Sequence, residues 1–206
     1  MRNRKVFIGA ILIALIILII FAFDFWIVEG ISSIRTNFLD GFFLGLTFIS
    51  SKFIIFFFLT ILFISFRKKR EWVLPLWSTL VIASIVNFFL KIAVQRPRPF
   101  QLGIVSILPI LEKASHAVWN FSFPSGHAII VFSVLPLLNK EFPKLKYMWI
   151  IFAVLVAFSR VYLGLHFLSD VIVGGLIGYL LGAVIVRIEK ENKFWGKIYR
   201  KFLGKK

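Results

Sequence analysis

Long apolar segments, separated by short polar ones, run along this chain. The first of them, residues 6–23, carries no charge and would rise about 27 Å as an α-helix, close to the thickness of the hydrocarbon core of a membrane. Five more apolar segments follow it. The pattern therefore predicts an all-α fold, an integral membrane bundle of six transmembrane helices. The predicted spans cover residues 6–23, 42–66, 72–90, 125–138, 147–161 and 166–186.

The polar segments indicate where the helices end. Residues 24–40 mix acidic residues, Ser, Arg and Asn with scattered apolar residues, which favours a short interfacial helix and a loop. The prolines within residues 96–99 stop the third helix and open a loop that reaches residue 122. Lys52 interrupts the second span, and it either extends outward to water or marks the true start of that span. The basic and aromatic tail, residues 187–206, either lies along an anionic membrane surface or is a frayed solubilising end.

Composition and the placement of charge define the broad class of the protein. Apolar residues make up 60% of the chain and the mean hydropathy is +0.93, which excludes a soluble protein. A net charge of +16 could suggest a nucleic-acid partner, but 18 of the 25 Lys and Arg residues fall on one side of the six-span layout. The positive-inside rule then predicts a multi-pass protein of the cell membrane with both termini in the cytoplasm and no nucleic-acid partner. We expect residues 1–206 to form one membrane-embedded domain.

Three separate stretches bring titratable side chains to the extracytoplasmic ends of the predicted spans. They are Lys91 with Arg98, the turn at residues 124–127, and residues 160–170. Charges near membrane depth are costly, so their usual role is functional and they usually have a partner. Cations outnumber acids in these stretches, so we expect an anion to bind between them.

Phosphate is the anion that this set of groups fits. Arginine binds two phosphate oxygens at once, lysine acts as a point charge, and the free amides of a helix start attract anions. The turn at residues 124–127 predicts such a start, because Pro lacks an amide hydrogen, Ser is a favoured N-cap and Gly lets a ligand approach the backbone. The predicted phosphate-binding residues are Lys91, Arg98, Arg160, Ser125 and Gly126, the last two through their amides.

Two histidines and one carboxylate supply the candidate chemistry. His166 and Asp170 are four residues apart on one helix face, so the carboxylate can orient the imidazole. We expect His166 to attack phosphorus and form a phosphohistidine, with His127 protonating the leaving oxygen and later activating water. No metal or other cofactor is expected, because the remaining acids on this face are scattered along the sequence. Those acids are Asp24, Glu29, Asp40 and Glu112.

These residues form three motifs with defined spacing. The motifs are Lys91, six residues, then Arg98-Pro99; Pro124-Ser125-Gly126-His127; and Ser159-Arg160, five residues, His166, three residues, Asp170. As a set they resemble the signature motifs of the type-2 phosphatidic acid phosphatase superfamily, which includes membrane lipid phosphatases and vanadium-dependent haloperoxidases. The resemblance implies the roles given above, with His166 as nucleophile, His127 as acid and base, and Asp170 as the orienting carboxylate. It also implies a likeness to small bacterial enzymes that act on undecaprenyl diphosphate or phosphatidylglycerol phosphate.

Several alternatives stay open at this point. We expect hydrolysis of undecaprenyl diphosphate to the monophosphate, and the rival substrates are phosphatidylglycerol phosphate, phosphatidic acid and lipid A. A lipid-phosphate transporter or binding protein would use the same cations without a nucleophile, and vanadate-dependent oxidation ranks last because the chain is not soluble. No obligatory protein partner is expected. Arg96 is expected to face lipid headgroups and His116 to lie at the membrane interface without a catalytic role.

Overall fold

The computed structural model describes residues 2–112 and 121–202, and within them the chain is helical with no β-strand. The expected all-α class is confirmed. The α-helices are α1 (Arg2–Ser33), α2 (Asn37–Ile49), α3 (Lys52–Ser65), α4 (Val73–Val94), α5 (Pro109–Glu112), α6 (Gly126–Glu141), α7 (Lys146–Tyr162), α8 (Leu168–Asn192) and α9 (Phe194–Phe202). Short 3₁₀ helices are η1 (Arg67–Trp72), η2 (Pro99–Leu102) and η4 (Pro143–Leu145).

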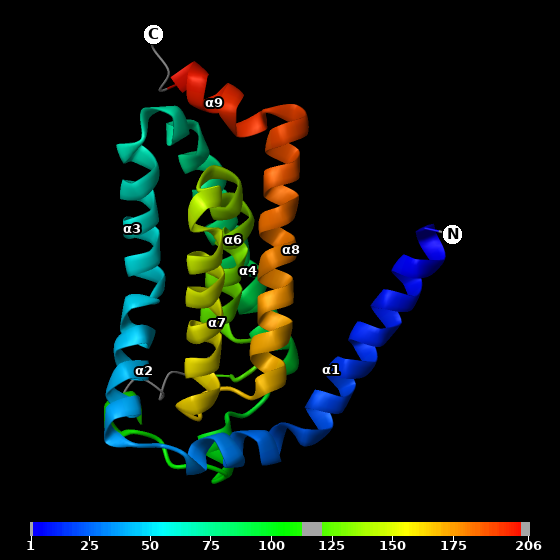
Figure 1. Cartoon of the computed structure of the whole chain (residues 1–206), viewed down its shortest axis with the longest axis vertical. Helices are drawn as coiled ribbons and strands as arrows, with labels where there is room; N and C mark the ends of the chain where they lie inside the picture. The colour runs from blue at the N-terminus through cyan, green and yellow to red at the C-terminus, as the bar shows by residue number, and fades with distance from the viewer. Residues whose placement is uncertain (1, 113–120, 203–206) are drawn as a thin grey trace.

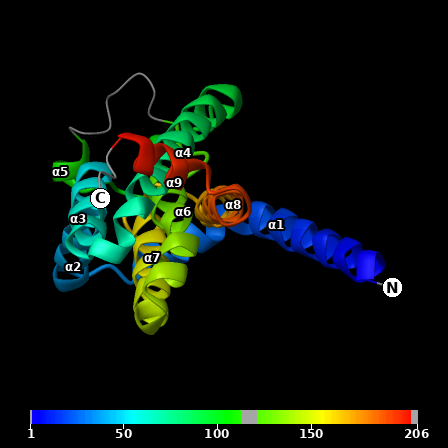
Figure 2. The ribbon, with the colours of Figure 1, turned by 90° about the horizontal axis from the view of Figure 1, so that it is seen from above.

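Helix α6 lies at the centre of a bundle and contacts α3, α4, α7 and α8 (Figure 1). Only one end of α1 contacts the bundle. Both views show its N-terminal end leaning away from the other helices, whereas its C-terminal end runs beneath α7 and α8 (Figures 1 and 2). Helix α9 crosses the opposite end of the bundle (Figure 1). The two ends of the bundle are called here the site end, where α6 and α8 begin, and the far end, where α9 lies.

Four helical stretches among the described residues are long and apolar enough to cross a membrane, and α2 with α3 would make a fifth. The chain is therefore a multi-pass helical membrane protein. The four stretches are Phe7–Ser33, Arg67–Leu102, Pro143–Tyr162 and Leu168–Asn192. The predicted fourth span corresponds to α6, whose 16 residues would rise only about 24 Å. The sixth span and the cytoplasmic placement of the termini stay predictions.

Two predicted boundaries are wrong. Residues 24–33 do not form a separate interfacial helix but continue α1, because no proline interrupts them. The second span is not continuous: α2 and α3 meet at 59° across Ser50 and Ser51. The Ser50 hydroxyl donates to the carbonyl of Thr47, a bond that competes with the helical ladder. Lys52 is the first residue of α3, so it marks the start of a helix.

Helices α6 and α8 approach each other closely because α8 carries glycines four residues apart. A Cβ atom at Gly178 would overlap the carbonyl oxygen of Ile129, and one at Gly182 would overlap that of Ser133. In a membrane, where apolar side chains gain little from leaving lipid, small residues that let backbones touch are a main source of helix association. This contact fixes the start of α6 beside the start of α8.

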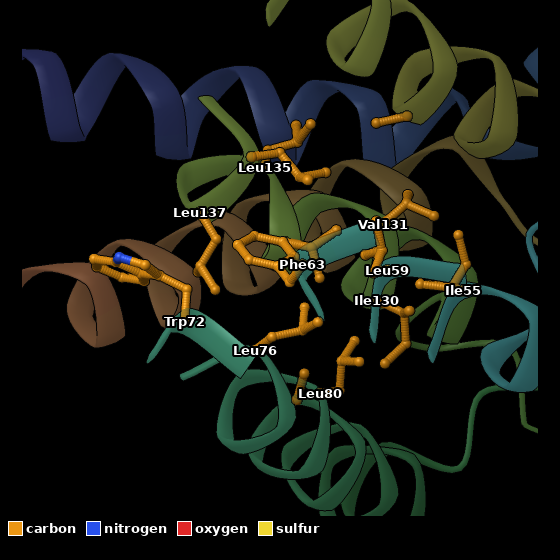
Figure 3. Packing of buried hydrophobic residues seen from close by; sticks show 14 of the residues in the cluster. Ile55, Leu59, Phe63, Trp72, Leu76, Leu80, Ile130, Val131, Leu135 and Leu137 are labelled. Carbon is orange, nitrogen blue, oxygen red and sulfur yellow. The ribbon is translucent and has the colours of Figure 1, made fainter. Parts of the chain in front are cut away.

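The apolar core holds α3 and α4 against α6. Figure 3 shows side chains from α3, η1, α4 and α6 meeting in one cluster, in which Phe63, Leu76 and Leu137 have no exposed surface. Close packing of this kind sets the height of each helix relative to its neighbours. The end of α4, which carries Lys91, is thereby held near the start of α6.

The C-terminal tail is helical over residues 194–202, which argues against a frayed end in that part. The buried Glu189 accepts hydrogen bonds from the amides of Trp195 (2.9 Å) and Gly196 (3.0 Å), and so caps the start of α9. Arg200 lies 3.7 Å from Glu71 of η1. Helix α9 is therefore tied to the far end of the bundle.

Candidate active site

The starts of α6 and α8 lie side by side at the site end. The amide of Ser125, which precedes α6, donates to the backbone carbonyl of Asp170 in the first turn of α8 (3.1 Å). Ser125 is the N-cap residue of α6, as predicted, but its hydroxyl makes no capping hydrogen bond. Two of the predicted motifs, far apart in the sequence, thus meet through a backbone hydrogen bond.

His166 is expected on the same helix as Asp170, but it lies in the loop between α7 and α8, because α8 begins only at Leu168; it is buried. Its Nδ1 atom is 2.7 Å from the carbonyl oxygen of Ser122. Because a carbonyl oxygen only accepts hydrogen bonds, Nδ1 carries the proton and Nε2 keeps a lone pair. Burial, followed by the charges of Arg98 and Lys91, lowers the pKa of His166 well below its usual value, so the imidazole is neutral near pH 7.

Asp170 acts on His166 mainly through Ser122. Its Oδ2 atom lies 3.8 Å from Nδ1 of His166, beyond hydrogen-bond distance, so the direct orienting bond predicted from the sequence is absent. The same oxygen accepts hydrogen bonds from the hydroxyl of Ser122 and from the amide of Phe167 (2.8 Å). The carboxylate therefore caps the start of α8 and fixes the residue whose carbonyl holds the imidazole.

Arg160, at the end of α7, is buried beside this loop. Its Nη1 atom donates to the hydroxyl of Thr47 (3.1 Å), whereas its Nε atom has no partner among the described residues. Its carbonyl oxygen accepts the amides of Leu165 (3.1 Å) and His166 (3.2 Å), so the loop folds back over the end of α7. Arg98 is also buried and donates from Nη1 to the carbonyl of Leu165 (3.2 Å). The two guanidinium groups thus flank the loop that carries the candidate nucleophile.

Lys91 completes the group of cations. It lies in the last turn of α4 and donates to the carbonyl of Phe121, close enough to Arg98, Arg160 and Asp170 for their charges to act on it. Within residues 2–112 and 121–202, neither Lys91 nor Arg160 pairs with a carboxylate. Buried positive charge without an acidic partner favours binding of an anion.

His127 lies in the first turn of α6, where Arg160, His166 and Arg98 act on it electrostatically. The hydroxyl of Ser125 is buried and has no partner in the described part of the chain. The Ser125 amide, predicted to bind phosphate, donates to the carbonyl of Asp170 in this structure and so already has a partner. The Ser125 hydroxyl and the amide of Gly126, the first residue of α6, stay candidate donors at this helix start.

Several residues at the site were not found from the sequence. Asn87 lies one turn before Lys91, and its side-chain nitrogen would be 3.2 Å from a Cβ atom at Gly126, so it packs directly on the start of α6. Its Oδ1 atom is buried without a partner in the described residues. The spacing of four residues from Lys91 within an apolar helix is the signal that could have identified it. Thr47 and Ser122 carry no comparable signal.

The prediction that Arg96 faces lipid headgroups is wrong. Its side chain is largely buried and pairs with Asp24 (2.9 Å) and Asp170 (2.8 Å). Asp24, one of the acids scattered along the sequence, is thereby part of the site.

His116 lies outside the described residues. The described residues contain no group of three His, Cys, Asp or Glu side chains that could hold a metal ion.

Comparisons with known proteins agree with the geometry of the site. A family model described as the PAP2 superfamily matches residues 72–194, which contain all three motifs. An undecaprenyl-diphosphatase of Sulfolobus acidocaldarius is 36% identical over 130 residues, covering 62% of this chain and 60% of the relative. A phosphatidylglycerophosphatase B of Bacillus subtilis is 36% identical over 120 residues, covering 53% and 54%. A lipid A 1-phosphatase of Rhizobium etli is 33% identical over 103 residues, covering 50% and 44%.

These curated relatives are thus matched over about half of their own length, whereas solved structures match over nearly all of theirs. The transmembrane PAP2 type phosphatidylglycerolphosphate phosphatase from Bacillus subtilis superimposes with a TM-score of 0.68 at 26% identity, covering 89% of this chain and 98% of that one. Aquifex aeolicus LpxE gives a TM-score of 0.64 at 26% identity, with coverage of 80% and 94%.

Proposed function

The chain belongs to the PAP2 superfamily, and from this premise we propose that it is a membrane lipid phosphatase. It removes the terminal phosphate of a lipid phosphate or diphosphate without a metal ion. The observation that carries this proposal is the state of His166: its Nδ1 proton is held by the carbonyl of Ser122, so Nε2 is available as a nucleophile beside buried cations. A protein that only binds lipid phosphate would need the cations but not this arrangement.

The reaction proceeds in two steps. Nε2 of His166 attacks phosphorus in line, a phosphorus–nitrogen bond forms, and the bond to the leaving oxygen breaks as His127 donates a proton to that oxygen. His127, now without that proton, accepts one from water, and the hydroxide displaces the phosphoryl group from Nε2. Inorganic phosphate leaves, and both histidines return to their starting states.

The cations stabilise the phosphoryl group during transfer. Arg160 and Arg98 bind the equatorial oxygens with their planar guanidinium groups, and Lys91 adds a point charge. The buried hydroxyl of Ser125 and the amide of Gly126 donate from the start of α6. Positioning and charge stabilisation of this kind are the main contributions that proteins make to phosphoryl transfer.

Undecaprenyl diphosphate is the proposed substrate, cleaved to undecaprenyl phosphate at the extracytoplasmic face of the cell membrane. The similarity to an undecaprenyl-diphosphatase supports this choice, and the other relatives make phosphatidylglycerol phosphate and lipid A the rival substrates. An apolar groove of about 800 Å³ runs between α6, α7 and α8, from Leu168 and Val171 near the site to Leu180. Its lining suits a long hydrocarbon chain whose phosphate lies at the site end.

The extracytoplasmic placement of the site is supported by the distribution of Lys and Arg, most of which fall on the opposite side of the predicted six-span topology.

A substrate panel tests this proposal. Purified protein in detergent would be assayed for phosphate released from undecaprenyl diphosphate, phosphatidylglycerol phosphate, phosphatidic acid and lipid A, with and without EDTA. We expect turnover that EDTA does not reduce, the highest kcat/KM for undecaprenyl diphosphate, and none in His166→Asn. Phosphate release by His166→Asn equal to that of the wild type would reject His166 as the nucleophile. Lipid binding by the wild type without any phosphate release would reject the enzyme and favour a transporter or binding protein.

A further inference from the structure

Asp24 is a buried carboxylate in helix α1, directly after the uncharged apolar run of residues 6–23. Its side chain has no exposed surface, and it accepts hydrogen bonds from the amide (3.0 Å) and the hydroxyl of Ser169 in the first turn of α8. Its Oδ2 atom also lies 2.9 Å from Nη2 of Arg96. An ionised group at this depth is costly unless it is paired and hydrogen-bonded, so every one of these contacts is needed to keep it there.

Arg96 lies between Asp24 and the active site. Its Nη2 atom binds Asp24, whereas its Nη1 atom donates to Asp170 (2.8 Å) and to Ser169 (2.8 Å). The rings of Phe21 and Phe167 face its guanidinium at 4.5 and 3.9 Å from their centroids. Two carboxylates therefore neutralise Arg96 and two rings enclose it, which separates it from the phosphate-binding arginines. Its position is fixed by groups from α1 and α8.

The contacts continue from Arg96 to the candidate nucleophile. Oδ1 of Asp170 binds Arg96, Oδ2 accepts the hydroxyl of Ser122, and the carbonyl of Ser122 holds Nδ1 of His166. The chain of contacts from Asp24 to His166 thus crosses four separate segments of the sequence. Each bond fixes the direction of the next, because a carboxylate or guanidinium held at one end presents its other atoms in a set orientation.

We propose that Asp24 and Arg96 are positioning residues that set the tautomer and orientation of His166 through Asp170 and Ser122. Helix α1, which otherwise leans away from the bundle, is then part of the active site and not only a membrane anchor. This inference rests on the proposed phosphatase function. A ring that turns away from the in-line direction loses catalysis steeply, because a misplacement of about 1 Å can cost about 100-fold in rate.

Asp24→Asn and Arg96→Gln test the proposal, with Asp40→Asn as a matched control. Asp40 forms a comparable, partly buried ion pair with Arg35 (3.2 Å) at the site end. The two readouts are steady-state kinetics and nitrogen NMR of the protein labelled with ¹⁵N-histidine, in which the signals missing from His166→Asn identify that ring. The NMR readout reports which ring nitrogen of His166 carries the proton. This property would not change if Asp24 and Arg96 only stabilised the fold.

We expect the wild type and Asp40→Asn to show the Nδ1-protonated tautomer of His166. In Asp24→Asn and Arg96→Gln this signal should shift toward a mixture of tautomers, and kcat should fall about 10- to 100-fold while KM changes about twofold or less. The double variant should be no worse than Arg96→Gln alone, because both substitutions interrupt the same contacts. Asp24→Asn keeps the shape of the side chain, so it decides the question if Arg96→Gln does not fold.

An unchanged His166 signal together with unchanged kcat in Asp24→Asn would overturn the proposal, even if the variant melts at a lower temperature. The NMR readout does not depend on turnover. If the wild type released no phosphate from any lipid, the proposed function would fail, whereas the tautomer of His166 in the variants would still support or overturn the positioning role.

Discussion

The two ends of the bundle both gather basic side chains, but they compensate them differently. At the far end, Lys69 and Lys140 lie 3.3 and 3.4 Å from Glu141, and Arg200 lies 3.7 Å from Glu71. The pair of Arg200 with Glu71 is about half exposed, so water and salt weaken it, whereas the two lysines and Glu141 are partly buried and each of these cations has an acidic neighbour. The basic residues of the far end agree with the proposal that this end faces the cytoplasm, because such residues prefer the cytoplasmic side of a membrane.

At the site end the positive charge is in excess and largely removed from water, because Arg98 and Arg160 are buried and Lys91 is half-buried. Arg96 is neutralised by Asp24 and Asp170, but Lys91 and Arg160 have no acidic partner among the described residues. Removing cations from water without compensation is costly, and a protein gains nothing from it unless a ligand supplies the missing charge. The number of charges alone therefore does not distinguish the two ends, whereas burial without an acidic partner supports the proposed anion site at the site end.

The largest expected effect concerns the contact that brings the site end together. Gly178→Leu would place a side chain against the backbone of α6 at Ile129 and force α6 and α8 apart, so activity should fall to background and the yield of folded protein should drop. Gly45→Ala is the matched control, since nothing lies within 4 Å of a Cβ atom there. Phosphate release and size-exclusion profiles measure both. A well-folded, active Gly178→Leu would show that the two helix starts do not depend on this contact.

Arg160→Lys should produce the next largest effect. Lysine keeps the charge but loses the planar fork, so kcat should fall about 100-fold with no change in melting temperature. Arg200→Lys makes the same chemical change at the far end, where the side chain is exposed, and should leave kcat within about twofold of the wild type. Equal losses in the two variants would remove the distinction between the two ends.

Ser125→Ala should have a smaller effect. It removes one buried hydroxyl that has no partner in the described residues and leaves the backbone bond to Asp170 in place. We expect kcat/KM to fall about 5- to 20-fold, which corresponds to about 1–2 kcal/mol and lies within the range for the loss of one hydrogen bond. Melting temperature should not fall, because the hydroxyl makes no hydrogen bond to any of the described residues. A fall in melting temperature with unchanged kcat/KM would assign the hydroxyl to structure alone.

Glu71→Gln, at the far end, should have the smallest effect. It removes the acidic partner of Arg200, a pair in which both side chains are about half exposed. The free energy of unfolding should change by less than about 1 kcal/mol, and phosphate release should stay within error of the wild type. A thermal melt and the standard assay are sufficient. A marked loss of activity would mean that the far end influences the chemistry.

The sequence predicts the features of this protein that depend on local patterns. Apolar runs locate the helices, and motifs with fixed spacing identify Lys91, Arg98, Arg160 and both histidines as one group. The break between α2 and α3 has a local signal as well, because Ser50 and Ser51 directly precede Lys52. These features can be predicted from the sequence because they do not depend on how the helices pack.

Other features arise only from tertiary contact. Asp24 is one of several scattered acids in the sequence, and nothing local distinguishes it from Asp40. Arg96 lies two residues from a motif arginine, so only packing reveals that Arg96 faces carboxylates and Arg98 faces the loop. The role of Ser122 depends on its backbone carbonyl, which carries no sequence signal at all.

Trapping the covalent intermediate tests most directly whether His166 is the nucleophile. Protein quenched during turnover of a lipid diphosphate labelled in its terminal phosphate would be digested, and the labelled peptide identified by mass spectrometry. The account predicts acid-labile, base-stable label on His166 in the wild type and none in His166→Asn. Label on another residue, or turnover without label on His166, would contradict the assignment of that imidazole as the nucleophile.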